Sequence, residues 1–139
     1  MTKYPIEVEL RIDWSEQDLY GHVNNTTYFK YIQASRLVYL EKIGLSKAYM
    51  RKNIGPILAA TSCQFKKQMF FPGNIKVCSG VNFIKNSSFG IHHLIKNQEG
   101  EIVAEADDII VTFDFIKNEK VNCPIEVREK IELIENQKF

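Results

Sequence analysis

Hydrophobic and polar residues alternate strictly near the start of the chain. Apolar side chains occupy every even position from Ile6 to Trp14, and charged side chains occupy the positions between them. A period of two residues places one kind of side chain on each face of a strand. The pattern therefore predicts a half-buried strand over Ile6–Trp14.

A helical pattern follows after a polar stretch. Neither proline nor glycine interrupts the chain between Asn24 and Ile43, and apolar side chains would cover much of the circumference of a helix there. A helix that is apolar on most sides is buried, and Gly44 is a suitable residue for its C-terminal end. We expect one long, largely buried helix over this range.

After the helix, from Ile57 to Ile116, the chain shows strand patterns separated by turn signals. Pro124 then begins a short helix that runs to Glu135. The order of elements predicts an α+β fold in which a curved antiparallel sheet wraps a long central helix. Without a linker or a repeat, residues 1–139 are expected to form a single domain. The four strands expected after the helix are Ile57–Met69, Ile75–Phe83, Phe89–Lys96 and Ile102–Phe115.

Composition narrows the functional classes. The 18 Lys and Arg nearly cancel the 17 Asp and Glu, for a net charge of +1, which argues against extended nucleic-acid binding. No segment has the length of a membrane-spanning helix or the pattern of a signal peptide. Cys63 and Cys78 have no zinc-like spacing and are expected to be buried free thiols. We expect a cytoplasmic protein without a metal or cofactor.

The residues that could carry chemistry lie between the first strand and the long helix. Residues 18–28 read D-LY-GHVNN-TT-Y. Asp18 supplies a carboxylate that can act as nucleophile or base, and Gly21 lets the backbone approach a substrate carbonyl. The start of a helix offers unpaired N–H groups and a partial positive charge to an oxyanion. These groups together favour acyl transfer.

This segment, placed between a strand and a buried helix, resembles the signature of the hot-dog fold acyl-CoA thioesterases of the 4-hydroxybenzoyl-CoA thioesterase-like family. The resemblance covers nearly the whole chain and implies hydrolysis of an acyl-CoA to free acid and CoA, in a tunnel between two subunits. Asp18 would be the catalytic carboxylate, and the amides near Gly21, His22 and Val23 would form the oxyanion site. Related plant acyl-carrier-protein thioesterases have an asparagine where this chain has Tyr20, so their Asn–His scheme is not supported.

Other residues of the motif are expected to support the site or bind substrate. Asn24 and Asn25 are suited to capping the helix, and Tyr28 to packing under the loop, with substrate contact as the alternative for all three. His22 could orient substrate, tune Asp18 or hydrogen-bond to the loop. In the family, basic residues near the dimer edge hold the CoA nucleotide. The candidates here are Lys66, Lys67 and Lys85.

Neighbouring polar residues on a strand point to opposite faces. His92 and His93 are therefore not expected to share a metal, and Asp107 and Asp108 are not expected to form a carboxylate dyad. One of the aspartates should face solvent while the other meets a cation across an interface. Arg36, within the buried helix, should pair with an acid, with a ligand contact as the alternative.

Two other functions share this fold class. A hydroxyacyl dehydratase or hydratase would need a different arrangement of His and acid, and a non-catalytic module would bind an acyl group or CoA without turnover. Asp18 favours hydrolysis. Because a single sheet leaves its edges unpaired, a homodimer or homotetramer is expected. The acyl group, the choice between these assemblies and the nucleophilic or general-base role of Asp18 stay open.

Overall fold

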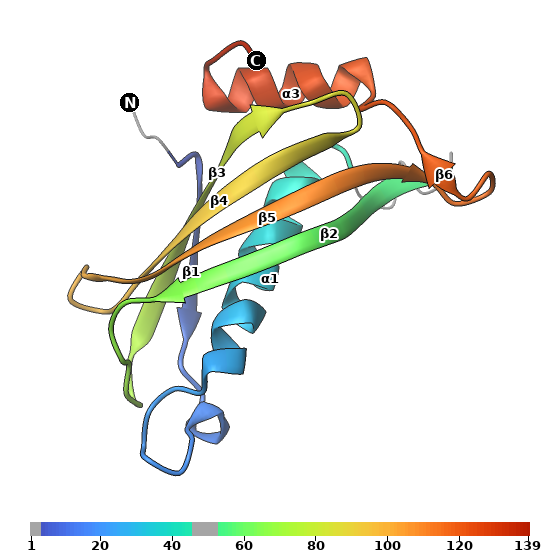
Figure 1. Ribbon diagram of the computed structural model, residues 1–139. Coiled ribbons are helices and arrows are strands. Elements are labelled where there is room, and N and C mark those ends of the chain that lie inside the picture. The colour runs from blue at the N-terminus through green and yellow to red at the C-terminus, as the bar shows by residue number, and fades with distance from the viewer. Residues whose placement is uncertain (1–3, 46–52) are drawn as a thin grey trace.

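The computed structural model describes residues 4–45 and 53–139. A six-stranded sheet lies against one long helix, which confirms the expected α+β fold with a central helix (Figure 1). Its elements are β1 (Ile6–Arg11), the short 3-10 helix η1 (Trp14–Glu16), α1 (Asn25–Lys42), β2 (Ile54–Phe65), β3 (Asn74–Ile84), β4 (Ser88–Lys96), β5 (Ile102–Asp114), β6 (Glu119–Lys120) and α3 (Ile125–Glu135).

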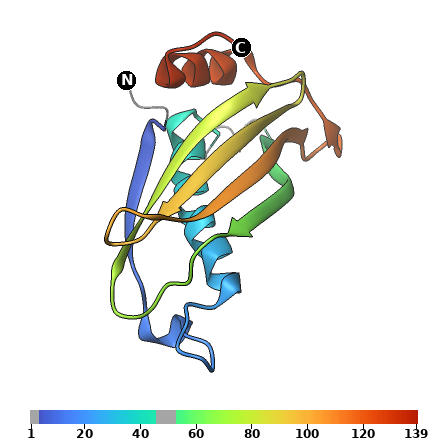
Figure 2. The ribbon, with the colours of Figure 1, turned by 60° about the vertical axis from the view of Figure 1, so that its left-hand side comes forward.

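Every pair of neighbouring strands in the sheet is antiparallel. The order is β1-β3-β4-β5-β2, with β6 beside the end of β5. β1 and β2 are therefore the two edges of the main path. Figure 2 shows α1 behind the sheet and α3 across one end of it. The open end of the sheet, opposite α3, carries η1 and the loop before α1.

Alternation along the strands builds the hydrophobic core between the sheet and α1. Ile6, Val77 and Ile95 point inward from β1, β3 and β4, and α1 contributes Ile32 and Tyr39. The helix begins where the side chain of its N-cap, Asn24, accepts a hydrogen bond from the backbone N–H of Thr26. It ends before Gly44, whose φ of 84° suits a residue without a side chain.

The first strand is shorter than its alternation predicts. β1 ends at Arg11, and the Asp13 side chain caps η1, which holds Trp14 outside the sheet with 71% of its surface exposed. The prediction that the strand continues to Trp14 is therefore wrong. A capping interaction between Asp13 and Glu16 overrides the periodicity at this point.

The strand after the helix is displaced from its predicted range. β2 begins at Ile54 and ends at Phe65, rather than covering Ile57–Met69. It ends because the N–H groups of Lys66 and Lys67 both turn to the carbonyl oxygen of Val103. Lys66 and Lys67 consequently lie in the loop that follows β2. The other expected strands and the C-terminal helix lie within about two residues of their predictions.

Cys63, Cys78 and Cys123 are free thiols; Cys78 is buried, as predicted, whereas Cys63 is only half-buried. Burial raises the pKa of Cys63 to about 11, so it is protonated at neutral pH. Within residues 4–45 and 53–139, no helix is both long enough and apolar enough to cross a membrane.

Candidate active site

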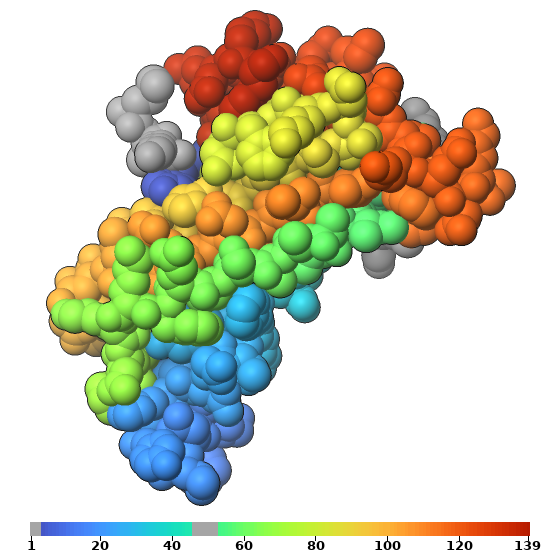
Figure 3. Space-filling model, viewed as in Figure 1, coloured from blue at the N-terminus to red at the C-terminus, as the bar shows by residue number. Residues whose placement is uncertain are grey.

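Most of the candidate residues of the motif meet in one pocket. This pocket has a volume of about 400 Å³ and lies between the start of α1 and the segment after β2. Figure 3 shows these two parts of the chain side by side at the surface. Its lining residues are Asp18, His22, Val23, Asn25, Tyr28, Phe65, Lys66, Lys67 and Gln68.

The half-buried carboxylate of Asp18 is held by the backbone of its own loop. Oδ1 accepts hydrogen bonds from the N–H groups of Tyr20, at 2.9 Å, and His22, at 3.0 Å. Oδ2 accepts no hydrogen bond from the part of the chain that the structure describes. One carboxylate oxygen therefore fixes the orientation of the group, and the other is available to substrate or water.

The amides named as oxyanion donors already have acceptors in the protein. Gly21 N–H donates to the carbonyl oxygen of Asp18 at 3.1 Å, and Val23 N–H donates to that of Met69 at 2.8 Å. His22 N–H donates to Asp18 Oδ1. An oxyanion at any of these amides would have to displace an internal hydrogen bond.

The amide of Asn25 is placed differently. Asn25 is the first residue of α1, so its N–H points out of the helix start, and the residue lines the pocket. Among residues 4–45 and 53–139 its N–H has no hydrogen-bond acceptor. Asn24 is the helix cap, as predicted, whereas Asn25 is not.

The aromatic residues of the motif form the walls of the site. Tyr28 is 3% exposed, and its hydroxyl donates to the carbonyl oxygen of Lys67 at 3.3 Å. Its ring meets that of Phe65 edge-on, with centroids 5.0 Å apart. The ring of His22 packs edge-on against Phe70, also at 5.0 Å. Tyr28 therefore packs against the end of β2 and the residue Lys67 that follows it, and His22 rests against the same segment.

The three candidate lysines do not lie together. Lys66 and Lys67 line the pocket, where Lys66 pairs with Glu105 at 3.7 Å and Lys67 pairs with Glu101. Lys85 instead follows the C-terminal residue of β3, and its ammonium lies 5.3 Å from the ring centroid of Phe83. The structure thus brings only Lys66 and Lys67 to the pocket.

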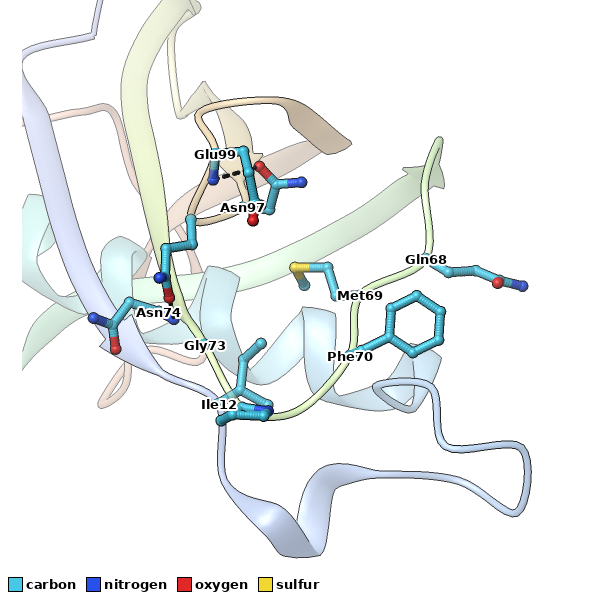
Figure 4. A pocket seen from close by; sticks show the side chains of 10 residues that line it. Ile12, Gln68, Met69, Phe70, Gly73, Asn74, Asn97 and Glu99 are labelled. Carbon is cyan, nitrogen blue, oxygen red and sulfur yellow. Dashed lines mark hydrogen bonds between the residues drawn. The ribbon is translucent and has the colours of Figure 1, made fainter.

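A second pocket, of about 230 Å³, lies on the other side of the segment that carries Met69 and Phe70 (Figure 4). It shares Gln68 with the first pocket. Two amide side chains that line it accept hydrogen bonds from the backbone. Asn97 Oδ1 accepts from Glu99 N–H at 3.1 Å, and Gln98 Oε1 accepts from Asn74 N–H.

A chain of polar side chains crosses the interior between α1 and the sheet. Arg36 pairs with Asp108 at 3.0 Å, which confirms that Arg36 meets an acid. His93 links Asp108, at 2.7 Å, to Ser79 Oγ, at 2.6 Å, and Ser79 meets Ser35 Oγ at 2.5 Å. The cation that Asp108 meets therefore belongs to the same chain, rather than lying across an interface as expected.

The two neighbouring pairs do face opposite sides of the sheet, as predicted. His93 and Asp108 are fully buried, whereas His92 and Asp107 form an exposed pair at 2.8 Å. Burial alone would raise the pKa of Asp108. Hydrogen bonds from His93, Thr61 and Arg36 outweigh it and hold this pKa below its ordinary value.

The sequence reasoning missed Glu16. Its side chain is only 9% exposed and contacts both η1 and α1. The spacing of Asp13 and Glu16 matches a capping box, which could have identified its local contacts. Its contacts with α1 had no signal in the sequence. In the described part of the chain, no group of three or more His, Cys, Asp or Glu is placed to hold a metal ion.

Known proteins resemble this chain over most of its length. A thioesterase from Thermus thermophilus, solved with coenzyme A and zinc, superposes with a TM-score of 0.87 over 100% of both chains at 20% identity. The DHNA-CoA thioesterase of Staphylococcus aureus gives a TM-score of 0.81 over 94% of this chain and 93% of its own, at 21% identity. The uncharacterized protein YsmA of Bacillus subtilis is 26% identical over 72% of this chain and 67% of its own. Residues 12–131 match the model of the thioesterase-like superfamily, and the chain belongs to that family.

Proposed function

We propose that this protein hydrolyses acyl-CoA thioesters to a free acid and CoA, with Asp18 as the catalytic carboxylate. One observation carries the proposal: a carboxylate oriented by two backbone amides shares a pocket with an amide at a helix start that has no acceptor among the described residues. The family supports the reaction class, and the named relatives that act on or bind CoA compounds support CoA as the carrier.

The thioester carbonyl would lie between Asp18 and Asn25. The Asn25 N–H would donate to the carbonyl oxygen as negative charge develops on it, aided by the partial positive charge of the helix start. We assign this donor in place of the amides of Gly21, His22 and Val23, because those three already serve acceptors in the protein. His22 would then line the pocket through its ring.

Asp18 Oδ2 could act in either of two ways. It could attack the carbonyl carbon and break the C–S bond, so that the thiolate leaves and water later opens the mixed anhydride. Alternatively, it could take a proton from a water molecule that attacks the same carbon. Both routes use the oxygen that accepts no hydrogen bond from the described part of the chain.

We also propose that two copies pair through β2. Among the described strands, this one bonds only to β5, and it contains no charged residue along its 12 positions. Edge strands that stay unpaired are usually protected by charged side chains or proline; here Pro56 stands near one end only. The pocket begins where β2 ends, so pairing through this edge would bring a second chain close to it.

The dimer is tested by adding charge to the edge. Ala60 and Ser62 are exposed and lie opposite Ile109 and Asp107 on β5. The double variant Ala60→Lys, Ser62→Lys should sediment as a monomer where the wild type sediments as a dimer, because like charges would meet across the pair. Sedimentation of the wild type as a monomer at micromolar concentration would refute pairing through β2.

Release of free thiol from a panel of acyl-CoAs tests the activity. Asp18→Asn should lower kcat at least about 10²-fold, the usual contribution of a catalytic acid or base. Asp107→Asn is the matched control, since Asp107 is an exposed aspartate on the outer face of the sheet. If the wild type binds acyl-CoA and releases no thiol, the protein is a binding module. If it instead hydrates an enoyl-CoA, the dehydratase alternative holds.

A further inference from the structure

The carboxylate of Glu16 lies at the junction of three segments around the candidate site. Its Oε1 accepts hydrogen bonds from Asp13 N–H, at 2.8 Å, and from the hydroxyl of Tyr31, at 2.7 Å. Its Oε2 pairs with Lys30 Nζ at 3.3 Å. With 9% of the side chain exposed, this is a largely buried carboxylate whose two oxygens both have partners.

The backbone of Glu16 extends the same junction. Its carbonyl oxygen accepts the N–H of Asn24, the cap of α1, at 2.8 Å. Main-chain and side-chain atoms of this one residue therefore tie the loop to the helix at three points, the cap Asn24, Lys30 and Tyr31.

These attachment points lie on the same rigid element as the proposed oxyanion donor. Tyr31 is 3% exposed in the core and belongs to α1, as does Asn25. On the other side of the junction, Glu16 stands two residues before Asp18 in the chain. Glu16 therefore links the chain just before Asp18 to the helix that carries the Asn25 N–H.

We infer that Glu16 is a positioning residue, which anchors the Asp18 loop to α1 and so sets the geometry between Asp18 and the Asn25 amide. The inference rests on the proposed hydrolysis for its catalytic consequence. Hydrogen bonds to an ionised carboxylate are stronger than those between neutral groups, so a neutral replacement should loosen the loop without removing side-chain volume.

Glu16→Gln is the central variant. Its amide nitrogen would face either Lys30 or the two donors at Oε1, so at least one contact becomes donor to donor. We expect kcat to fall between about tenfold and 10²-fold, because small displacements of catalytic groups carry costs of this size. KM should change by less than about threefold, since substrate contacts stay in place.

Tyr31→Phe removes a single hydrogen bond from the same carboxylate and should give a smaller loss of kcat in the same direction. Glu41→Gln is the matched control, because Glu41 is an exposed glutamate further along α1. Asp18→Asn should cost less in the Glu16→Gln background than in the wild type, since both changes act on one catalytic group.

Hydrogen exchange provides a readout that does not require activity. The amides of Tyr20 and His22 donate to Asp18 Oδ1, and the amide of Asn24 donates to Glu16. All three should exchange faster in Glu16→Gln than in the wild type, while amides of β4 exchange at the same rate. Unchanged exchange at these three amides would overturn the anchor. Unchanged kcat with faster exchange would overturn its part in catalysis. Failure of the wild type to cleave any acyl-CoA would overturn the proposed function alone, because the exchange comparison still decides the anchor.

Discussion

The guanidinium of Arg36, on α1, donates a hydrogen bond across 3.0 Å to Oδ2 of Asp108, on β5. The Asp108 side chain has no exposed surface, and that of Arg36 is 12% exposed. Thr61 Oγ1, on β2, donates to the other oxygen of the carboxylate at 2.7 Å, and His93 Nε2, on β4, meets Oδ2 at 2.7 Å. One carboxylate thus connects the central helix to three strands.

Asp108→Asn should destabilise the fold by about 3–5 kcal/mol, because it leaves Arg36 as a buried charge without its counter-ion. Urea unfolding monitored by circular dichroism measures the loss. Asp107→Asn, in the exposed pair with His92, should cost about 1 kcal/mol or less. Equal effects of the two substitutions would mean that burial of the ion pair does not matter.

Stability should fall at acid pH partly through Asp108. Its pKa is lowered in the folded state, so its contribution is present above about 3.9, the value of an unfolded aspartate. That contribution is lost as the pH falls from there through the folded pKa. The free energy of unfolding should therefore decline more steeply below about pH 4 in the wild type than in Asp108→Asn. Parallel pH profiles would contradict this assignment.

Glu135 should change the stability of the fold with pH in the opposite direction to Asp108. Burial raises its pKa, although the hydroxyl of Tyr39, at 2.5 Å, and the N–H of Val81, at 2.8 Å, oppose the shift. A raised folded pKa gives stability that is complete below about pH 4.3 and is lost as the pH rises through the folded pKa. The stability of Glu135→Gln relative to the wild type should therefore increase with pH over that range. Thermal unfolding at a series of pH values measures this, and a constant difference would refute it.

The pocket lysines should affect binding of CoA more than the folding of the chain. Lys66→Met and Lys67→Met should raise KM for an acyl-CoA by about twofold to fivefold each, because an exposed ion pair contributes ~1 kcal/mol or less. KM for the matching acyl-N-acetylcysteamine, which lacks phosphates, should not change. Lys85→Met is the informative third variant. A larger effect on KM there would place the nucleotide beside the C-terminal end of β3.

Local patterns predicted the elements of this fold well. Alternation from Ile6 to Leu10 and the uninterrupted helical segment before Gly44 both gave correct elements, because burial on one face determines each pattern. The error at Trp14 arose because a capping box ends the alternating pattern there. The spacing of Asp13 and Glu16 in the sequence is the signal for that capping box.

The site was less predictable, since its details depend on contacts between distant segments. The motif places Asp18 and Asn25 near the helix start, and both line the pocket. The Val23 N–H donates a hydrogen bond to the carbonyl oxygen of Met69, and the Glu16 carboxylate accepts one from the Tyr31 hydroxyl. No local pattern encodes either pairing, because both depend on how the segments pack in three dimensions.

Neighbouring residues on β4 and β5 form two histidine–aspartate pairs in different surroundings. A histidine meets an aspartate twice, at 2.8 Å between His92 and Asp107 and at 2.7 Å between His93 and Asp108. The first pair has 23% and 58% of its side-chain surface exposed and the second pair has none. Following both imidazoles by NMR in one sample would compare a histidine–aspartate contact through Nδ1 near the surface with one through Nε2 in the protein interior, at identical temperature, salt and concentration.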